Sequence, residues 1–395
     1  MISTTNLHML TMLADVLHGR QPAPVAEDEW PALFRELSAQ TVFALPAEYL
    51  NTLGLSAENE IRYLKAVVKN RQTFYSLLKE QERTLSILDE AEISAVVIKG
   101  AAAAASYPHP ENRCMGDIDL LVLPQDFERA YAVLVSAGYK TEQTLDDYIR
   151  HIELTGEDNI EIELHNNFSS GENQEQNTIL DEALFRAIPS RQAVTLCGSS
   201  VPVLPPLENG LVLLAHINQH LRRGLGLRQI IDWMLFAEKY VDDDFWGNTF
   251  AEKAEKIGMK RLAIIVTAMC QKYLGMQGNI HWCKYEPVCD KLMEYIFTYG
   301  NFGYKLDRAQ FKTVFVLRMM RNPIRGFSEM QSSGLLTWKA AQKHRWLRPF
   351  AWCYQLVRWT KLGIKNGVSA EMLDQATSSA KEEYDLLKNL GITRI

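Results

Sequence analysis

Two aspartates, Asp117 and Asp119, alternate with apolar residues in the run 116–122. At strand periodicity they project from one face, while Ile118 and Leu120 fill the other. Two carboxylates placed so close together disfavour each other's ionisation. A divalent cation resolves that conflict, because hard oxygen ligands suit Mg²⁺ and its charge offsets theirs. The motif predicts a metal site on a strand, and the alternative is a solvated strand edge.

A metal site that catalyses nucleotide chemistry usually takes a third carboxylate from a neighbouring strand. Glu161 and Glu163 are the candidates, in the strictly alternating segment 160–165. Both share a face with His165, while the apolar residues of the segment occupy the other face. That polar face equally fits the solvent side of an edge strand, so both roles stay open from the pattern alone.

Lys99 and Gly100 lie between a β-branched run, 93–98, and five alanines, 101–105. The pattern predicts a strand, a tight turn and a helix. Backbone N–H groups at a helix start favour phosphate, and glycine permits close approach. The lysine adds a point charge for a triphosphate, although a simple turn with an exposed lysine also fits. Arg113, just upstream of the aspartates, either contacts phosphate or orders its loop through a carboxylate.

These residues must be positioned by a compact unit of strands and helices. A helix is expected over 124–137, ended by Gly138, because glycine commonly stops helices. Further strands are expected over 149–154 and 160–165. The order across 93–168 is then β, α, β, α, β, β, which is typical of a small mixed-sheet core.

Helical periodicity dominates on both sides of this core. A long amphipathic helix is expected over 58–90, and further helices over 211–220, 227–239 and 250–273. The stretch from Pro202 to Pro206 is a plausible boundary. The sequence therefore predicts an α+β protein with three parts: an N-terminal helical region (1–90), the α/β core (91–205) and a C-terminal helical domain (206–395).

Composition restricts the class of protein. The chain has 395 residues, 47% hydrophobic and 23% charged, which is ordinary for a soluble globular protein. Its net charge of −6 gives no global electrostatic attraction for nucleic acid. Six scattered cysteines argue against a disulfide framework and for a reducing compartment. With no signal-peptide pattern and no apolar run long enough to span a bilayer, we expect a cytoplasmic protein without a transmembrane segment.

A second group of polar residues lies downstream. His216 and His220 are four apart, on one helical face. Such a pair can ligate zinc, but the glutamate of the metalloprotease motif is missing. We favour contacts to substrate or to the residues that hold it over metal ligation, and plain helix packing of the two histidines fits the pattern at least as well. Arg228 and Asp232 are also four apart and fit a pair with each other.

The C-terminal stretch 318–365 combines basic and aromatic residues. It holds ten of the lysines and arginines and four of the eight tryptophans. This composition can bind nucleic acid, anionic lipid or a partner protein. We favour amphipathic helices with buried tryptophans, because tryptophans in folded helical domains are mostly buried. Nucleic-acid binding is thus compatible with the sequence but not favoured.

A series of motifs resembles the family of uncharacterised nucleotidyltransferases, within the polymerase-β-like nucleotidyltransferase superfamily. The resemblance covers residues 90–240 and is specific in its order. The motifs of this chain that carry the resemblance are Lys99-Gly100, Arg113, Gly116-Asp117-Ile118-Asp119-Leu120-Leu121-Val122, Gly138-Tyr139, Glu163-Leu164-His165, and His216-x-x-x-His220 followed by Gly224 to Asp232.

The resemblance implies that Asp117 and Asp119 bind Mg²⁺, with two ions expected. Glu163, in preference to Glu161, would be the third catalytic ligand. Where the wider superfamily begins the preceding helix with Gly-Ser, this chain has Lys99-Gly100-Ala101. The residues expected at the nucleotide are Lys99, Gly100, Arg113 and Gly116. Those expected to support the site or to contact the acceptor are His165, His216, His220, Arg228 and Asp232.

The activity implied is transfer of a nucleoside monophosphate from an NTP to an acceptor hydroxyl, with release of pyrophosphate. The expected acceptor is a small molecule. Two alternatives remain: a catalytically silent nucleotide-binding accessory protein, and a nucleotidyltransferase that modifies a protein or RNA.

Overall fold

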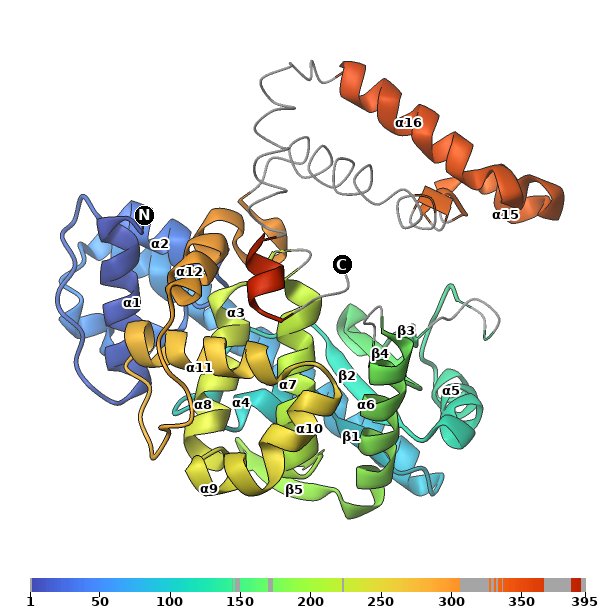
Figure 1. Ribbon diagram of the computed structural model, residues 1–395, viewed down its shortest axis with the longest axis horizontal. Coiled ribbons are helices and arrows are strands. Elements are labelled where there is room, and N and C mark those ends of the chain that lie inside the picture. Colours follow the sequence, from blue (N-terminus) through green and yellow to red (C-terminus); the bar gives the residue numbers. More distant parts are fainter. Residues whose placement is uncertain are drawn as a thin grey trace. The chain divides into compact units, whose positions relative to one another are not determined.

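The computed structural model of the protein describes residues 2–143, 145, 150–169, 173–221, 224–305, 327, 330–331, 333–335, 337–365 and 385–391 (Figure 1). The chain divides into two compact units. The first comprises residues 1–302 with 390–395, and the second comprises residues 303–389. Each unit is described by itself. The three-part division by sequence, at residues 90 and 205, stays a prediction.

The first unit is built on a mixed sheet of six strands. Their order is β3-β4-β2-β1-β6-β5. The pairs β2–β4 and β1–β6 are parallel, and the other three pairs are antiparallel. The predicted α+β class with a mixed sheet is confirmed. The strands are β1 (Ala95–Val97), β2 (Ile118–Val122), β3 (His151–Thr155), β4 (Glu161–His165), β5 (Gln192–Leu196) and β6 (Ser199–Val203).

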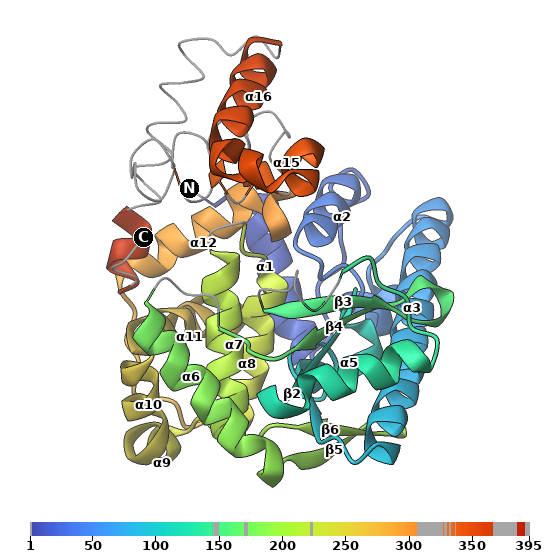
Figure 2. The same ribbon diagram turned by 90° about the vertical axis from the view of Figure 1, so that its right-hand side faces the viewer.

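Helices make up most of the remaining described chain. The helices of the first unit are α1 (Thr4–Leu17), α2 (Trp30–Ala39), α3 (Ala57–Glu90), α4 (Gly100–Ala104), α5 (Phe127–Ser136), α6 (Gln174–Ala187), α7 (Pro206–His220), α8 (Leu227–Tyr240), α9 (Asp243–Phe245), α10 (Ala251–Lys256), α11 (Lys260–Leu274) and α12 (Pro287–Tyr299). Helix α3 lies on one side of the sheet, and α7 and α8 lie on the other (Figure 2).

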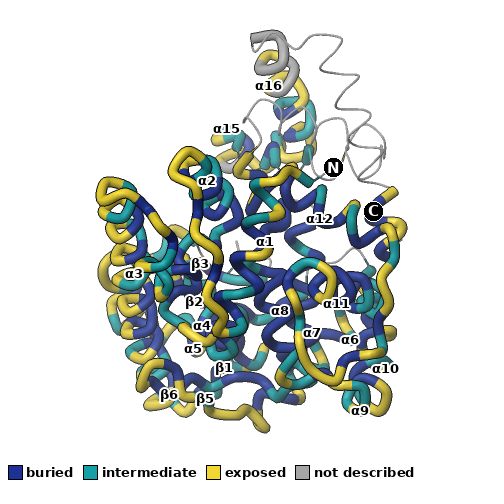
Figure 3. The backbone as a smooth tube through the Cα atoms, turned by 90° about the vertical axis from the view of Figure 1, so that its left-hand side faces the viewer, coloured by how far each residue is buried: buried dark blue, intermediate teal, exposed yellow. Residues whose placement is uncertain are grey.

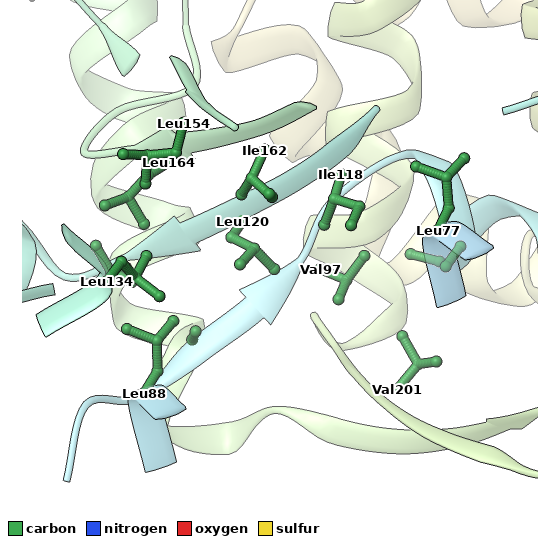
Figure 4. Packing of buried hydrophobic residues seen from close by; sticks show 14 of the residues in the cluster. Leu77, Leu88, Val97, Ile118, Leu120, Leu134, Leu154, Ile162, Leu164 and Val201 are labelled. Atoms are coloured by element: carbon green, nitrogen blue, oxygen red, sulfur yellow. The ribbon is translucent and has the colours of Figure 1, made fainter. Parts of the chain in front are cut away.

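One face of the sheet is apolar and packs against α3 and α5. Ile118 and Leu120 of β2 and Ile162 and Leu164 of β4 are all buried, as alternation along the strands requires. They join Leu77 of α3 and other leucines in one hydrophobic cluster (Figure 4). The opposite face therefore carries the polar residues of the same strands.

Helix α3 confirms the long helix expected over 58–90. It runs 34 residues, and several of its turns are exposed while the neighbouring strands are buried (Figure 3). Its first turn holds Glu58 and Glu60, whose negative charges stabilise the helix by interacting with the positive end of its dipole. Phe74 and Leu88 are fully buried in the cluster beneath the sheet. The helix thus supplies much of the wall that holds the sheet in place.

The hairpin of β5 and β6 was not among the expected elements. Its two-residue turn is Cys197-Gly198, with φ of 49° and 91°. Positive φ at both central residues is typical of the tight turns that match strand twist. Pro202 lies inside β6. The sheet ends at Val203 and α7 begins at Pro206, so the change from strand to helix falls within the expected stretch 202–206.

The single helix expected over 250–273 is also wrong. It is broken between α10 and α11, where Gly258 has a φ of 70°. Glycine adopts this left-handed conformation at no steric cost and ends the first helix there. The helices expected over 211–220 and 227–239 are confirmed as α7 and α8.

The second unit contains α15 (Lys339–Lys343) and α16 (Ala351–Lys365), within the basic and aromatic stretch. Trp338 stacks on Tyr354, and Trp352 contacts Phe327, while Trp346 is 71% exposed. The expectation of buried tryptophans is therefore wrong for Trp346. Residues 318–326, 328–329, 332 and 336 of this stretch lie outside the described residues. Among the helices that the structure describes, none has the length and apolar character needed to cross a bilayer.

The absence of a side chain at Gly210 lets α7 pack closely against the rings of Phe236 and Phe250. A Cβ there would lie 2.6 Å from Phe250 Cε2 and 2.8 Å from Phe236 Cε1. We expect Gly210→Ala to destabilise the protein by about 1–3 kcal/mol, because overpacking forces neighbouring side chains to move. Gly247→Ala is the control, since its Cβ would meet nothing within 4 Å. Equal urea midpoints for the two variants would contradict this packing.

Candidate active site

The polar face of the sheet gathers its carboxylates where β2 and β4 run in parallel. Their register places Asp119 directly beside Glu163. His165 Nε2 lies 3.0 Å from Asp119 Oδ1 and 3.1 Å from Glu163 Oε2. The fully buried imidazole therefore bridges the two carboxylates and fixes how they face each other. The structure brings together two of the three expected metal ligands.

Asp117 precedes β2 by one residue, rather than lying on the strand as expected. Burial, followed by the charge of Asp119, raises the pKa of Asp117 to about 6, with Glu163 adding to the effect and Lys99 opposing it. The three carboxylates therefore act on one another electrostatically. This excess of negative charge fits a divalent cation, which relieves the repulsion and accepts hard oxygen ligands.

Lys99 reaches the carboxylates directly. Its Nζ lies 2.6 Å from Asp119 Oδ1, and the two side chains are 12% and 3% exposed. Burial opposes ionisation of Asp119, but the Lys99 charge and the His165 hydrogen bond together lower its pKa below the ordinary value. Lys99 is thus the counterion of Asp119 in this structure.

The backbone at Lys99 adopts a conformation that side chains rarely tolerate. Its φ is 60° and its ψ is −136°, at the position that begins α4. Such conformations cost on the order of 1–3 kcal/mol and cluster at functional sites. Gly100 follows with a φ of 27°. Glycine would adopt this conformation without strain, yet the chain has lysine here. This indicates that the ammonium group of Lys99 is needed at this position.

Gly116 is exposed beside Asp117. A Cβ at Gly116 would meet nothing within 4 Å, so packing inside the protein does not require glycine there. The position that a side chain at residue 116 would take is therefore open among the described residues. Open space at this position is compatible with the expected contact between Gly116 and a nucleotide.

Of the two candidate glutamates, only Glu163 lies beside Asp119. Glu161 is exposed and lies opposite Thr155 of β3. The geometry therefore favours Glu163 as the third carboxylate, in keeping with the preference from the sequence.

The sequence analysis missed His151, which pairs with His165 across β3 and β4. His151 Nε2 lies 3.7 Å from Glu163 Oε1. Donor atoms of His151, Glu163 and His165 all lie within 4.8 Å of one another. A signal existed: His-x-Glu in 151–153 mirrors Glu-x-His in 163–165, and an antiparallel pair can bring such motifs face to face.

Arg113 bonds to Asp232 of α8 rather than to Asp117, Asp119 or Glu163. Its Nε and Nη2 each donate to Asp232 at 2.7 Å, and Tyr107 donates its hydroxyl to the same carboxylate. Both charged side chains are nearly fully buried, at 3% and 1% exposure. The ion pair occupies Nε and Nη2 of the guanidinium, and the expected phosphate contact stays a prediction. The structure supports the alternative, in which Arg113 orders its loop. It also pairs Asp232 with Arg113 rather than with Arg228.

The two histidines of α7 contact each other. His216 Nε2 and His220 Nε2 are 2.9 Å apart, and both residues are buried. Burial, then the charges of His220 and Lys99, lowers the pKa of His216 well below its ordinary value. One nitrogen of the pair must donate to the other, so these two atoms are used internally. The charge of Asp119 opposes this shift in the pKa of His216.

This fold and site define an α+β protein with a carboxylate centre on adjacent parallel strands, a class suited to cation-assisted phosphate chemistry. A family model described as an uncharacterised nucleotidyltransferase matches residues 26–275, which is more than half of the chain. The chain belongs to this family, and the resemblance noted from its motifs is confirmed.

Solved structures were compared as well. The crystal structure of an antigenic nucleotidyltransferase-like protein from Paracoccidioides brasiliensis is similar, with 15% sequence identity and a TM-score of 0.33. The match covers 53% of this chain and 94% of that chain. Its TM-score is too low to support an inference about the site. Curated proteins gave no significant match.

Strain at Lys99 can be separated from its charge. Lys99→Gly and Lys99→Ala both remove the ammonium from Asp119, but only glycine adopts φ 60° and ψ −136° freely. We expect the glycine variant to be more stable than the alanine variant by about 1–3 kcal/mol. Urea unfolding of both variants measures the difference. Equal stability would show that the turn relaxes and stores no strain.

The Arg113–Asp232 pair is expected to be structural. Asp232→Asn leaves a buried guanidinium without its counterion, which should cost about 3–5 kcal/mol. Glu182→Gln is the matched control, because it breaks an exposed ion pair with Arg186 and should cost less than about 1 kcal/mol. Thermal unfolding measures both variants. A loss for Asp232→Asn as small as that for the control would remove Asp232 from the structural framework.

Proposed function

We propose that the protein is a Mg²⁺-dependent nucleotidyltransferase that moves a nucleoside monophosphate from an NTP to the hydroxyl of a small-molecule acceptor. The acceptor oxygen forms a bond to the α-phosphorus, the bond from that phosphorus to the bridging oxygen breaks, and pyrophosphate leaves. The observation that carries the proposal is the pairing of Asp119 with Glu163 on adjacent parallel strands, with Asp117 in front of them.

Asp117, Asp119 and Glu163 would hold the two ions. When bound, these ions supply activation of the attacking oxygen and neutralisation of the charge that develops on phosphate. The donor set supports this assignment, because all three residues offer carboxylate oxygens, and burial followed by the charge of Asp119 raises the pKa of Asp117. His165 keeps Asp119 and Glu163 oriented through its hydrogen bonds.

Lys99 has two roles in this proposal. Its ammonium is the counterion of Asp119, at 2.6 Å. It would also supply positive charge to the phosphates of the nucleotide when Asp119 serves as a metal ligand. Gly100, at the start of α4, follows it directly in the chain.

Glu163 is the residue we assign to proton removal from the acceptor. It is more exposed than Asp119, at 24% against 3%, so an incoming hydroxyl can approach it. The net charge of −6 favours a small-molecule acceptor over RNA, because the protein has no overall attraction for polyanions. Six free thiols fit a reducing compartment, so a cytoplasmic location remains part of the proposal.

One observation favours a second candidate function. The Lys99–Asp119 ion pair satisfies a central carboxylate without any metal. A catalytically silent protein that binds nucleotide as an accessory would also retain this arrangement. Mg²⁺-dependent turnover distinguishes the two functions, because only the enzyme requires release of Asp119 from Lys99.

Transfer should depend on the three carboxylates. The assay incubates the full chain with each α-labelled NTP, Mg²⁺ and cell lysate, and follows label transfer. We expect Asp117→Asn combined with Asp119→Asn, and separately Glu163→Gln, to lower transfer by at least about 100-fold, since metal assistance supplies several kcal/mol. Glu161→Gln is the matched control on the same strand and should retain transfer. Unchanged transfer by the double variant would refute the proposed function.

A further inference from the structure

Two arginines, Arg113 and Arg228, each bond to a different partner beside the candidate active site. Arg113 uses its Nε and Nη2 on Asp232, and Tyr107 donates to the same carboxylate. Arg228 lies on α8, one turn before Asp232. Its Nη1 donates to the carbonyl of Cys114 at 2.9 Å. Asp232 is thus already engaged by two donors, and Arg228 is held by a neutral group.

The guanidinium of Arg228 has unused donor capacity. Its Nε is buried without a hydrogen-bond partner. Among the ion pairs of the described chain, none includes Arg228, whereas Arg113 has a complete one. A buried donor without a partner costs about 1–3 kcal/mol, and more when the group is charged. Arg228 therefore lacks both an ion-pair partner and an acceptor for its Nε within the described chain.

Deprotonation cannot remove this deficit. Burial, then the charge of Arg113, lowers the pKa of Arg228, and Asp232 opposes the shift. A guanidinium nevertheless stays protonated in proteins. The remaining way to balance the charge is an anion from outside the chain. Phosphate is well suited, because a planar guanidinium binds its oxygens through two parallel hydrogen bonds.

The position of Arg228 matches that requirement. Cys114, its hydrogen-bond partner, lies in the loop that leads to Asp117. The hydrogen bond to Cys114 therefore joins the guanidinium to the loop that carries Asp117, three residues further on. Arg228 itself is partly exposed, and the exposed Gly116 lies in the same loop. A ligand at the carboxylates therefore has Arg228 within its surroundings.

We propose that Arg228 forms an anion subsite that binds the pyrophosphate portion of the NTP, the part that leaves in the reaction. This inference rests on the proposed function, since it assigns a residue to the triphosphate of that substrate. Arg113 positions the loop, and Arg228 takes the phosphate contact that the sequence analysis gave to Arg113. Lys99 and Arg228 then place positive charge on the triphosphate from two different elements.

The test measures binding of pyrophosphate to the full chain in EDTA, so that divalent cations make no contribution. We expect pyrophosphate to raise the melting temperature of the unmodified protein, because a ligand that binds only the folded state stabilises it. Unmodified protein with no shift at saturating pyrophosphate would overturn the proposal, and this readout does not depend on any variant being folded.

Variants then assign the site. By titration calorimetry, we expect Arg228→Gln to weaken pyrophosphate binding at least tenfold, and Arg228→Lys to weaken it less, because lysine keeps the charge without the planar fork. Arg186→Gln, which changes an exposed arginine on α6, should leave the dissociation constant unchanged. A folded Arg228→Gln variant with unchanged affinity overturns the proposal, as does an equal loss in the Arg186→Gln control.

Failure of this inference is distinguishable from failure of the proposed function. The variant that combines Asp117→Asn and Asp119→Asn should lose transfer but keep pyrophosphate binding in EDTA. Arg228-dependent binding without any transfer by the unmodified protein would support the subsite and refute the enzyme. Transfer with unchanged binding by Arg228→Gln would refute the subsite alone.

Discussion

The parallel pairing of β2 with β4 is the constraint on which the site depends. It sets Asp119 beside Glu163 and Leu121 beside His165. A shift of one residue would turn Asp119 toward the leucines and Ile118 toward the polar face. The buried apolar set on the opposite face makes that shift costly, so the core that packs against α3 also fixes the geometry of the carboxylates.

Two buried ion pairs hold the loop that carries the aspartates. Arg113 anchors its beginning to α8 through Asp232, and Lys99 anchors Asp119 to the turn after β1. Removing one partner of such a pair leaves an uncompensated charge, so each anchor is difficult to lose. The segment between them contains exposed Gly116 and partly exposed Asp117, which is where a ligand can reach the site.

Much of this arrangement could be predicted from local pattern. Alternation gave the strands with Asp119 and Glu163, and glycine stops and alanine runs gave the neighbouring helices. Partners far apart in sequence could not be assigned, because several carboxylates compete for each cation. Asp232 lies four residues from Arg228 but binds Arg113, 119 positions away. Likewise, His151 faces His165 only because β3 and β4 pair antiparallel. Charge patterns identify the groups, and tertiary packing chooses among them.

Helix α3 has a consequence for how this protein can be divided. It belongs to the N-terminal helical part of the sequence, yet Phe74, Leu77 and Leu88 lie in the core beneath the sheet. A fragment that begins after α3 would leave the apolar face of β2 and β4 open to water. The family model, which starts at residue 26, includes this helix. The sheet and its helical wall are therefore one folding unit, and a segment that held only the carboxylate strands would lack part of its hydrophobic core.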